Sequence, residues 1–84
     1  MFYVYVLRSF ADGLLYTGFT QELRQRIQQH DAGLVRSTAK RLPVELIYYE
    51  ACRTQSDATR REKYLKSAWG KRYLKARLHD FLTG

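Results

Sequence analysis

Phe2-Tyr3-Val4-Tyr5-Val6-Leu7 is a run of β-branched and aromatic residues, which favours an extended strand. Turn residues follow at Ala11-Asp12-Gly13, and a second run from Leu14 to Phe19 comes at the spacing expected of a hairpin. The chain is therefore predicted to begin with two paired strands. The later elements must then cover the faces of the sheet that this hairpin starts.

The residues after the hairpin predict one helix and a third strand. Thr20 suits the N-cap of a helix from about Gln21 to Asp31, and Gly33 suits its C-terminal end. A polar, basic loop then leads to Pro43, which has no backbone N–H to give to a ladder and so marks the start of a strand. We expect this third strand over Val44 to Glu50.

Two more helices close the predicted fold. The first contains Glu62, and Gly70 is expected to end it. The second is expected from about Lys71 to Leu82, with an apolar stripe made by Leu74, Leu78, Phe81 and Leu82. The order ββαβαα predicts an α+β fold with a small three-stranded antiparallel sheet flanked by helices. Without a linker, repeat or low-complexity segment, residues 1–84 are expected to form one domain.

Composition limits the kind of site that this chain can build. A chain of 84 residues has one modest core, so chemistry is expected on an open face and not in a deep cavity. The single cysteine, Cys52, rules out an internal disulfide and a cysteine-rich zinc module. We find neither a membrane-spanning run nor a signal-peptide pattern, so we expect a cytoplasmic location and no membrane partner.

The positive charge is concentrated toward the end of the chain. The formal net charge is +7, and the stretch from Arg60 to Arg77 holds eight basic residues with Glu62 as its one acid. Aromatic residues that can stack on bases are interleaved with these charges, which favours a nucleic-acid partner over a merely soluble basic surface. The candidate contacts to nucleic acid are Thr38, Lys40, Lys66, Lys71, Arg72 and Lys75.

Two predicted helices turn polar groups toward the body of the protein. Glu62 lies in the middle of a stripe formed by Ala58, Leu65 and Trp69. An ionised carboxylate in that position is costly unless it is paired or holds a metal. On the earlier helix, one stripe contains Leu23, Arg26, Ile27 and His30. We therefore expect Glu62, Arg26 and His30 to have a chemical role, although each also has a structural reading as an ion pair or a satisfied core histidine.

These residues, together with the tyrosines of the hairpin, suit phosphodiester hydrolysis. The guanidinium of Arg26 can neutralise the charge that develops on the phosphate. A lone glutamate with waters suits one Mg²⁺ or Mn²⁺, and no small-molecule cofactor is expected. A tyrosine with a lowered pKa can activate water, and Tyr5 and Tyr16 are both candidates.

The motifs resemble those of the GIY-YIG nuclease superfamily. They are Tyr3-Val4-Tyr5, Tyr16-Thr17-Gly18, Arg26-Ile27-Gln28-Gln29-His30 and Arg61-Glu62-Lys63-Tyr64-Leu65-Lys66, in that order across nearly the whole chain. The chain is most similar to the small members that consist of the nuclease domain alone. It departs from the pattern in the first signature, which lacks its glycine, and at Thr17, where isoleucine is usual. It also contains no asparagine, which several of these nucleases carry in the site.

The resemblance implies DNA cleavage with a single divalent metal held by Glu62. It implies that Arg26 is the helix arginine of the site and that Tyr16 is the general base or orients the water. Tyr5 matches the tyrosine of the first signature, and His30 matches a supporting polar group. On this basis we expect a structure- or damage-selective endonuclease of DNA repair or processing, with branched or single-stranded DNA among its substrates.

Two alternatives stay open on the sequence. The chain is also compatible with a catalytically inactive nucleic-acid-binding module of the same fold. It is equally compatible with a nuclease subunit that needs a protein partner. Zinc is not expected, because His30 and His79 have no suitably spaced thiols.

Overall fold

The computed structural model describes all 84 residues and confirms the predicted fold class. Three antiparallel strands form one sheet in the order β2-β1-β3. The elements along the chain are β1 (Phe2–Ser9), β2 (Leu15–Thr20), α1 (Leu23–Asp31), β3 (Val44–Cys52), α2 (Gln55–Lys66), α3 (Ala68–Arg77) and α4 (His79–Thr83). None of the helices is long and apolar enough to cross a membrane.

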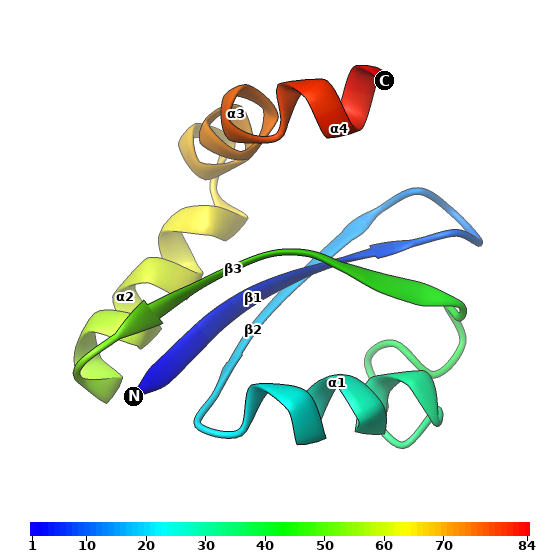
Figure 1. Ribbon diagram of the computed structural model, residues 1–84, viewed down its shortest axis with the longest axis horizontal. Helices are drawn as coiled ribbons and strands as arrows, with labels where there is room; N and C mark the ends of the chain where they lie inside the picture. The colour runs from blue at the N-terminus through cyan, green and yellow to red at the C-terminus, as the bar shows by residue number, and fades with distance from the viewer.

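Helices lie on both sides of the sheet, as Figure 1 shows, with α1 on one side and α2 and α3 on the other. The α2 side holds a core of buried apolar residues, namely Val4, Val6, Ala58, Leu65 and Leu74. The α1 side buries Tyr5, Leu7 and Val44, with Tyr16, Leu23 and Ile27 packed against them. Because successive residues of a strand point to opposite faces, β1 supplies both cores and is buried from Val4 to Leu7.

The register of the sheet places Tyr5 at its centre. Tyr5 pairs with Gly18 on β2 and with Tyr49 on β3. The β1–β3 ladder shifts between Val6 and Leu7, so that one residue of β3 is left unpaired. The two strand starts predicted at Phe2 and Val44 are confirmed, and β3 continues two residues beyond the predicted end at Glu50.

The predicted N-cap of α1 is wrong by two residues. Glu22 occupies the N-cap position and makes no side-chain cap bond. The hydroxyl of Thr20 instead accepts a hydrogen bond from the backbone N–H of Glu22, at 3.1 Å, and so turns the chain from β2 into the helix. The predicted helix end is confirmed, since Gly33 has a φ of +75° and its N–H donates to the carbonyl of His30.

The break between the last two predicted helices lies at Ser67 and not at Gly70. Ser67 ends α2 in an extended conformation, and its hydroxyl then accepts from the N–H of Gly70 to cap α3. Gly70 lies inside α3, where a Cβ would overlap the backbone of Tyr64 and Leu65. The glycine is therefore explained by the close approach of α3 to the end of α2.

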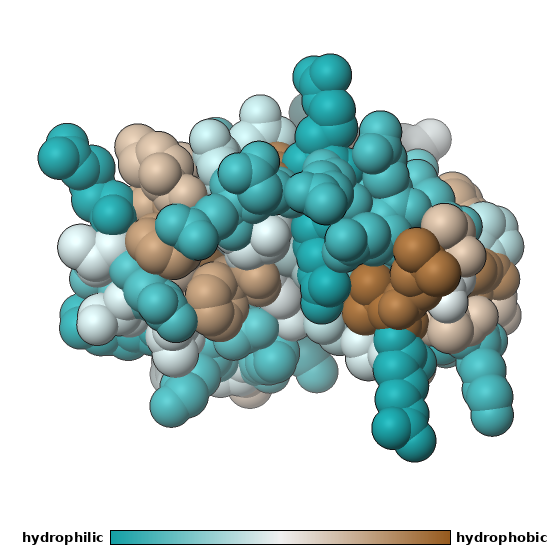
Figure 2. Space-filling view, turned by 90° about the horizontal axis from the view of Figure 1, so that it is seen from below, coloured by the Kyte–Doolittle hydropathy of each residue, from teal (hydrophilic) through white to brown (hydrophobic).

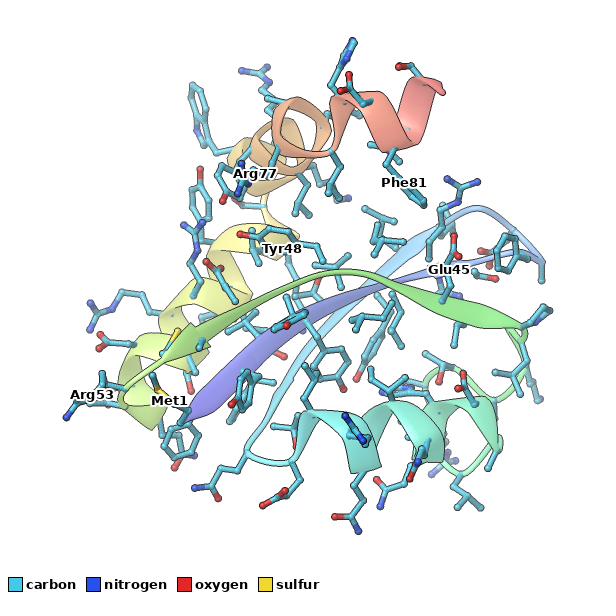
Figure 3. The ribbon with its side chains drawn as sticks, viewed as in Figure 1. Met1, Glu45, Tyr48, Arg53, Arg77 and Phe81 are labelled. Carbon is cyan, nitrogen blue, oxygen red and sulfur yellow. The ribbon has the colours of Figure 1, made fainter.

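This shift of the break moves Trp69 to the surface. A continuous helix would have placed Trp69 on the same inward stripe as Ala58 and Leu65. With the change of direction at Ser67, Trp69 is 68% exposed, so its prediction as an inward residue is wrong. The predicted last helix is also divided, because α3 ends at Arg77 and the short α4 follows. Figure 3 shows Phe81 pointing from α4 back toward the sheet, and the guanidinium of Arg8 lies over its ring.

Candidate active site

A buried tyrosine is the centre of the polar cluster on the α1 side of the sheet. Tyr5 has no exposed surface, and its hydroxyl lies 2.9 Å from Nε2 of His30. The Nε–H of Arg26 donates to the same hydroxyl oxygen at 3.4 Å. Burial raises the pKa of Tyr5, and the hydrogen bond from Arg26 opposes this increase. We therefore describe Tyr5 as a neutral phenol held between an arginine and a histidine.

His30 connects this phenol to the loop that follows α1. His30 is completely buried, and its Nδ1 lies 2.7 Å from Oγ1 of Thr38. Burial lowers the pKa of His30, and the nearby charge of Arg26 lowers it further. Because the charged form is disfavoured by both effects, His30 is a neutral imidazole at neutral pH and can accept a proton at one nitrogen.

Tyr16 completes the aromatic part of the cluster. Its ring centroid lies 5.3 Å from that of His30 and 6.3 Å from that of Tyr5. Tyr16 is only half-buried, so it is the tyrosine nearer to solvent. Gly18 lies beside both phenols, and a Cβ at this position would come within 2.7 Å of the Tyr5 hydroxyl oxygen. The final residue of the second signature is thus a glycine because a larger residue would displace the Tyr5 hydroxyl.

Arg26 links the buried cluster to the surface. It is half-buried on α1, and its Nη1 donates to Oε1 of Gln29 at 3.2 Å. A shallow, mostly polar hollow adjoins it, lined by Phe19, Thr20, Gln21, Glu22, Gln25, Arg26 and Gln29. Figure 2 views the molecule from the α1 side and shows a surface that is mainly hydrophilic there. A polyanion in this hollow could reach the guanidinium while Tyr5 and His30 stay shielded from water.

Glu62 belongs to α2, the helix that covers the opposite side of the sheet. Its side chain is 18% exposed, which agrees with the predicted inward position, and Lys66 lies 3.6 Å from its Oε2. No hydrogen bond or ion pair joins Glu62 to Tyr5, Arg26 or His30. The structure therefore brings together four of the five predicted catalytic residues, Tyr5, Tyr16, Arg26 and His30, and places Glu62 with Lys66.

The metal that the resemblance implies can be tested against the residues present. No three histidine, cysteine, aspartate or glutamate side chains gather closely enough to hold an ion by themselves. Mg²⁺ and Mn²⁺ do not need such a cage, because Mg²⁺ commonly keeps several waters and uses one or two carboxylates plus phosphate oxygens of the substrate. Glu62 offers one such carboxylate, half-buried and with a single lysine partner. Glu62 therefore fits a magnesium or manganese site in which waters and phosphate oxygens of the substrate supply the other ligands.

The predicted nucleic-acid contacts divide between surface and interior. Lys40, Lys66, Lys71, Arg72 and Lys75 are exposed, as contact with a phosphate requires. Thr38 is different, because it has no exposed surface and bonds to His30. The prediction that Thr38 contacts phosphate is therefore corrected, since its hydroxyl faces the interior. Lys71, Arg72 and Lys75 lie on α3, on the opposite side of the sheet from the Tyr5 cluster.

A second polar network on the α2 side had no counterpart in the sequence analysis. Arg61 donates to Oε1 of Glu50 at 2.6 Å, and its guanidinium lies 4.8 Å from the ring centroids of both Tyr64 and Tyr73. The hydroxyls of Tyr48 and Tyr73 lie 2.8 Å apart, and Figure 3 shows Tyr48 pointing from β3 to this side. The pairing of Glu50 with Arg61 explains why the residue next to Glu62 is basic: it joins α2 to β3.

Comparison with known proteins shows the family to which the chain belongs. A family model described as "GIY-YIG catalytic domain" matches residues 1–75. The chain belongs to the GIY-YIG family. Among relatives, it is 43% identical over 77 residues to a UPF0213 protein of Pediococcus acidilactici, covering 88% of this chain and 78% of that protein.

Other relatives of the GIY-YIG chain carry the same UPF0213 name. It is 47% identical over 66 residues to a protein of Natronomonas pharaonis, covering 77% of this chain and 76% of the other. It is 42% identical over 66 residues to a protein of Desulfotalea psychrophila, where the match spans 76% of this chain but only 59% of that longer protein. No solved structure gives a significant match. The chain is thus a small GIY-YIG protein, and this family is a nuclease family.

Proposed function

We propose that this GIY-YIG chain is a metal-dependent endonuclease that hydrolyses phosphodiester bonds in DNA. One observation carries the proposal, namely that buried Tyr5 is joined by hydrogen bonds to buried His30 and to half-buried Arg26. A fully buried histidine and tyrosine hydroxyl, with a half-buried arginine beside them, are costly to keep in a small core, which apolar residues would fill more cheaply. Their presence next to a polar surface hollow supports a chemical role.

Each residue of the cluster has a role that follows from its position. Arg26 reaches the surface, so its guanidinium can bind the phosphate and stabilise the negative charge of the transition state. Tyr16 is half-buried and can contact the attacking water, whereas Tyr5 is fully buried and stands behind it. We therefore assign contact with the water to Tyr16. Tyr5 and His30 would orient the tyrosine hydroxyls and hold the proton taken from the water.

Glu62 would hold the divalent ion, Mg²⁺ or Mn²⁺, together with waters and phosphate oxygens of the substrate. When bound, this ion would act as a Lewis acid that polarises the scissile phosphate. Lys66, which pairs with Glu62, would be freed to contact the phosphate backbone.

The size of the domain supports recognition of DNA shape or damage over recognition of base sequence. The hollow at Arg26 is shallow and polar, and few side chains are available for base edges. Nicked, flapped, branched and single-stranded DNA, as produced in repair or processing, are the substrates we would test. The reducing cytoplasm stays the expected location for a chain with one cysteine.

The test is cleavage of a labelled panel of single-stranded, duplex, flapped and branched DNA with Mg²⁺, Mn²⁺ or chelator. We expect Arg26→Ala and Glu62→Gln each to lower the cleavage rate by about 10²- to 10³-fold without loss of folding. Chelator should abolish cleavage in the wild-type protein. Arg24→Ala, two residues from Arg26 on the exposed side of α1, and Glu45→Gln are the matched controls and should stay near wild-type activity.

Activity that survives in Glu62→Gln or in chelator would disprove the metal mechanism. Absence of cleavage with retained DNA binding would favour the inactive binding module. Cleavage that appears only after a cell extract is added, and is lost again in Arg26→Ala, would favour the subunit that needs a partner.

A further inference from the structure

Thr38 is a buried residue that the proposed chemistry leaves without a role. It lies in the loop between α1 and β3, and Gly33, with its positive φ, turns the chain so that this loop returns to the helix. Its hydroxyl oxygen lies 2.7 Å from Nδ1 of His30, eight residues earlier. The same oxygen lies 3.5 Å from the carbonyl oxygen of Val35.

The direction of these hydrogen bonds follows from which atoms are able to accept. Arg26 has only donors, so its Nε–H donates to the Tyr5 oxygen. The proton of the buried Tyr5 hydroxyl then has Nε2 of His30 as its acceptor at 2.9 Å, whereas the nearby Tyr16 hydroxyl forms no hydrogen bond with Tyr5 in the structure. If Nε2 accepts, a neutral His30 must carry its proton on Nδ1 and donate it to Thr38. Thr38 in turn gives its own proton to the carbonyl of Val35.

The reverse direction leaves a buried group without a partner. If Thr38 donated to Nδ1, the proton of His30 would lie on Nε2 and point at Tyr5. The Tyr5 oxygen would then accept from both His30 and Arg26, and its own O–H would have only the Tyr16 hydroxyl nearby, with which the structure forms no hydrogen bond. A buried donor left unsatisfied costs about 1–3 kcal/mol. The first direction satisfies every group in the series.

We propose that Thr38 is a positioning residue that holds neutral His30 in the Nδ1-protonated tautomer, so that Nε2 is kept as the proton acceptor of Tyr5. The proposal rests on the proposed nuclease function for its purpose, although the tautomer itself does not depend on activity. In the arrangement it supports, the Tyr5 O–H donates to the unprotonated Nε2 and the Nδ1–H donates to Thr38, so the neutral phenol is held in one orientation beside Arg26.

A merely structural threonine would fill the same volume without fixing the tautomer. Thr38→Val keeps the shape and removes the hydroxyl, so a structural role predicts little change in His30. The tautomer proposal predicts that Nδ1–H loses its acceptor and that the proton moves to Nε2 in a large share of molecules. Thr38→Ser keeps the hydroxyl and should restore the wild-type state.

The measurement is ¹⁵N NMR of the imidazole nitrogens in the folded full chain at pH 8. The chain has two histidines, and His79, exposed on α4, provides an internal reference for an imidazole near the surface. In the wild-type protein we expect His30 to show a protonated Nδ1 and an unprotonated Nε2. Thr38→Val should shift the population toward Nε2–H, and Thr38→Ser should match the wild type.

Kinetics provide the second arm of the test. Thr38→Val should lower kcat by about 10- to 100-fold with KM little changed, and Thr38→Ser should recover most of that loss. A wild-type His30 protonated at Nε2, or a Thr38→Val spectrum unchanged from wild type, would overturn the proposal. If the protein cleaves no DNA, the spectra still decide the tautomer, so the two proposals fail separately. If Thr38→Val does not fold, the wild-type and Thr38→Ser spectra are sufficient.

Discussion

The two faces of the sheet bury different kinds of residue, although β1 supplies both. Toward α2 and α3 the buried residues are apolar, with Val4 and Val6 packed against Leu65 and Leu74. Toward α1 the buried residues include Tyr5, His30 and Thr38, which hydrogen-bond to one another. The apolar face has an evident stabilising role, because burial of apolar area is the main driving force of folding.

The polar face gains little net stability from its hydrogen bonds, since each replaces a bond to water. Its specific geometry is therefore better explained by function than by folding. If this is correct, substitutions on the apolar face should reduce stability more than activity. Substitutions on the polar face should reduce activity more than stability.

The largest effect on stability is expected from Leu65→Ala, on the apolar face. Leu65 is buried between α2 and the sheet, and removing its side chain leaves a cavity beside Val4 and Val6. We expect a loss of about 2–5 kcal/mol in the free energy of unfolding, measured by urea denaturation. Cleavage per folded molecule should stay near wild type. Leu34→Ala, at a position 74% exposed, is the control and should change stability by less than about 0.5 kcal/mol.

Gly18→Ala should reduce cleavage activity more than stability, because it perturbs the polar face. The added Cβ would lie 2.7 Å from the Tyr5 hydroxyl oxygen and so displace this hydroxyl from its partners. We expect a stability loss of about 1–3 kcal/mol from overpacking. Cleavage should fall by about 100-fold, as for other small misplacements of a catalytic group.

Gly13→Ala is the matched control for this experiment. Gly13, unlike Gly18, has a positive φ and nothing within 4 Å of its Cβ position, so the substitution adds backbone strain without touching the cluster. It should reduce stability and leave cleavage per folded molecule unchanged. A Gly18→Ala variant with normal cleavage would mean that the position of the Tyr5 hydroxyl does not matter to the chemistry.

Acid should weaken the polar face specifically. Burial, and then the charge of Arg26, lower the pKa of His30 in the folded state below its ordinary value of about 6.5. As the pH falls, the unfolded chain therefore binds a proton at His30 before the folded protein does. The contribution of neutral His30 to stability is complete above about pH 6.5 and is lost as the pH falls toward the folded pKa. Denaturation curves between pH 7.5 and 5 should show this loss in the wild type and in His79→Gln. His30→Gln should show a flatter profile, and an unchanged profile would contradict the buried neutral state.

Much of the fold could be predicted from the sequence because its strong local signals agree. The hairpin, the third strand after Pro43 and the end of α1 at Gly33 follow from strand propensity and turn chemistry. The helix break at Ser67 could not be placed, because a serine in a helical pattern gives a weaker signal than a glycine. In the sequence Gly70 has the pattern of a helix breaker, whereas the structure requires it for packing against Tyr64, which is a tertiary effect.

The site was predicted in part for similar reasons. Helical spacing correctly indicated that Arg26, His30 and Glu62 face inward. The contact of Thr38 with His30 could not be predicted, because the return of an irregular loop has no periodic pattern. The network of Arg61 with Glu50 and Tyr73 was missed as well, since it joins elements whose relative placement depends on the break at Ser67.

The smallest expected effect concerns which face carries the DNA. Replacing Lys71, Arg72 and Lys75 together by glutamine should make the slope of log K for DNA binding against log salt concentration less steep by about 2 to 3. Each phosphate contact contributes about 0.7 to 0.9 to this slope. Trp69, the one tryptophan in the chain, lies on α3 with the guanidinium of Arg72 5.0 Å from its ring centroid. Because Arg72 is one of the expected DNA contacts, DNA bound along α3 should quench the fluorescence of Trp69. Neutralising Arg24, Arg36 and Lys40, which are exposed on the α1 side, is the matched comparison. If this second set changes the slope while the first set and the fluorescence do not, the DNA lies along the polar face alone, and the charge of α3 contributes only to solubility.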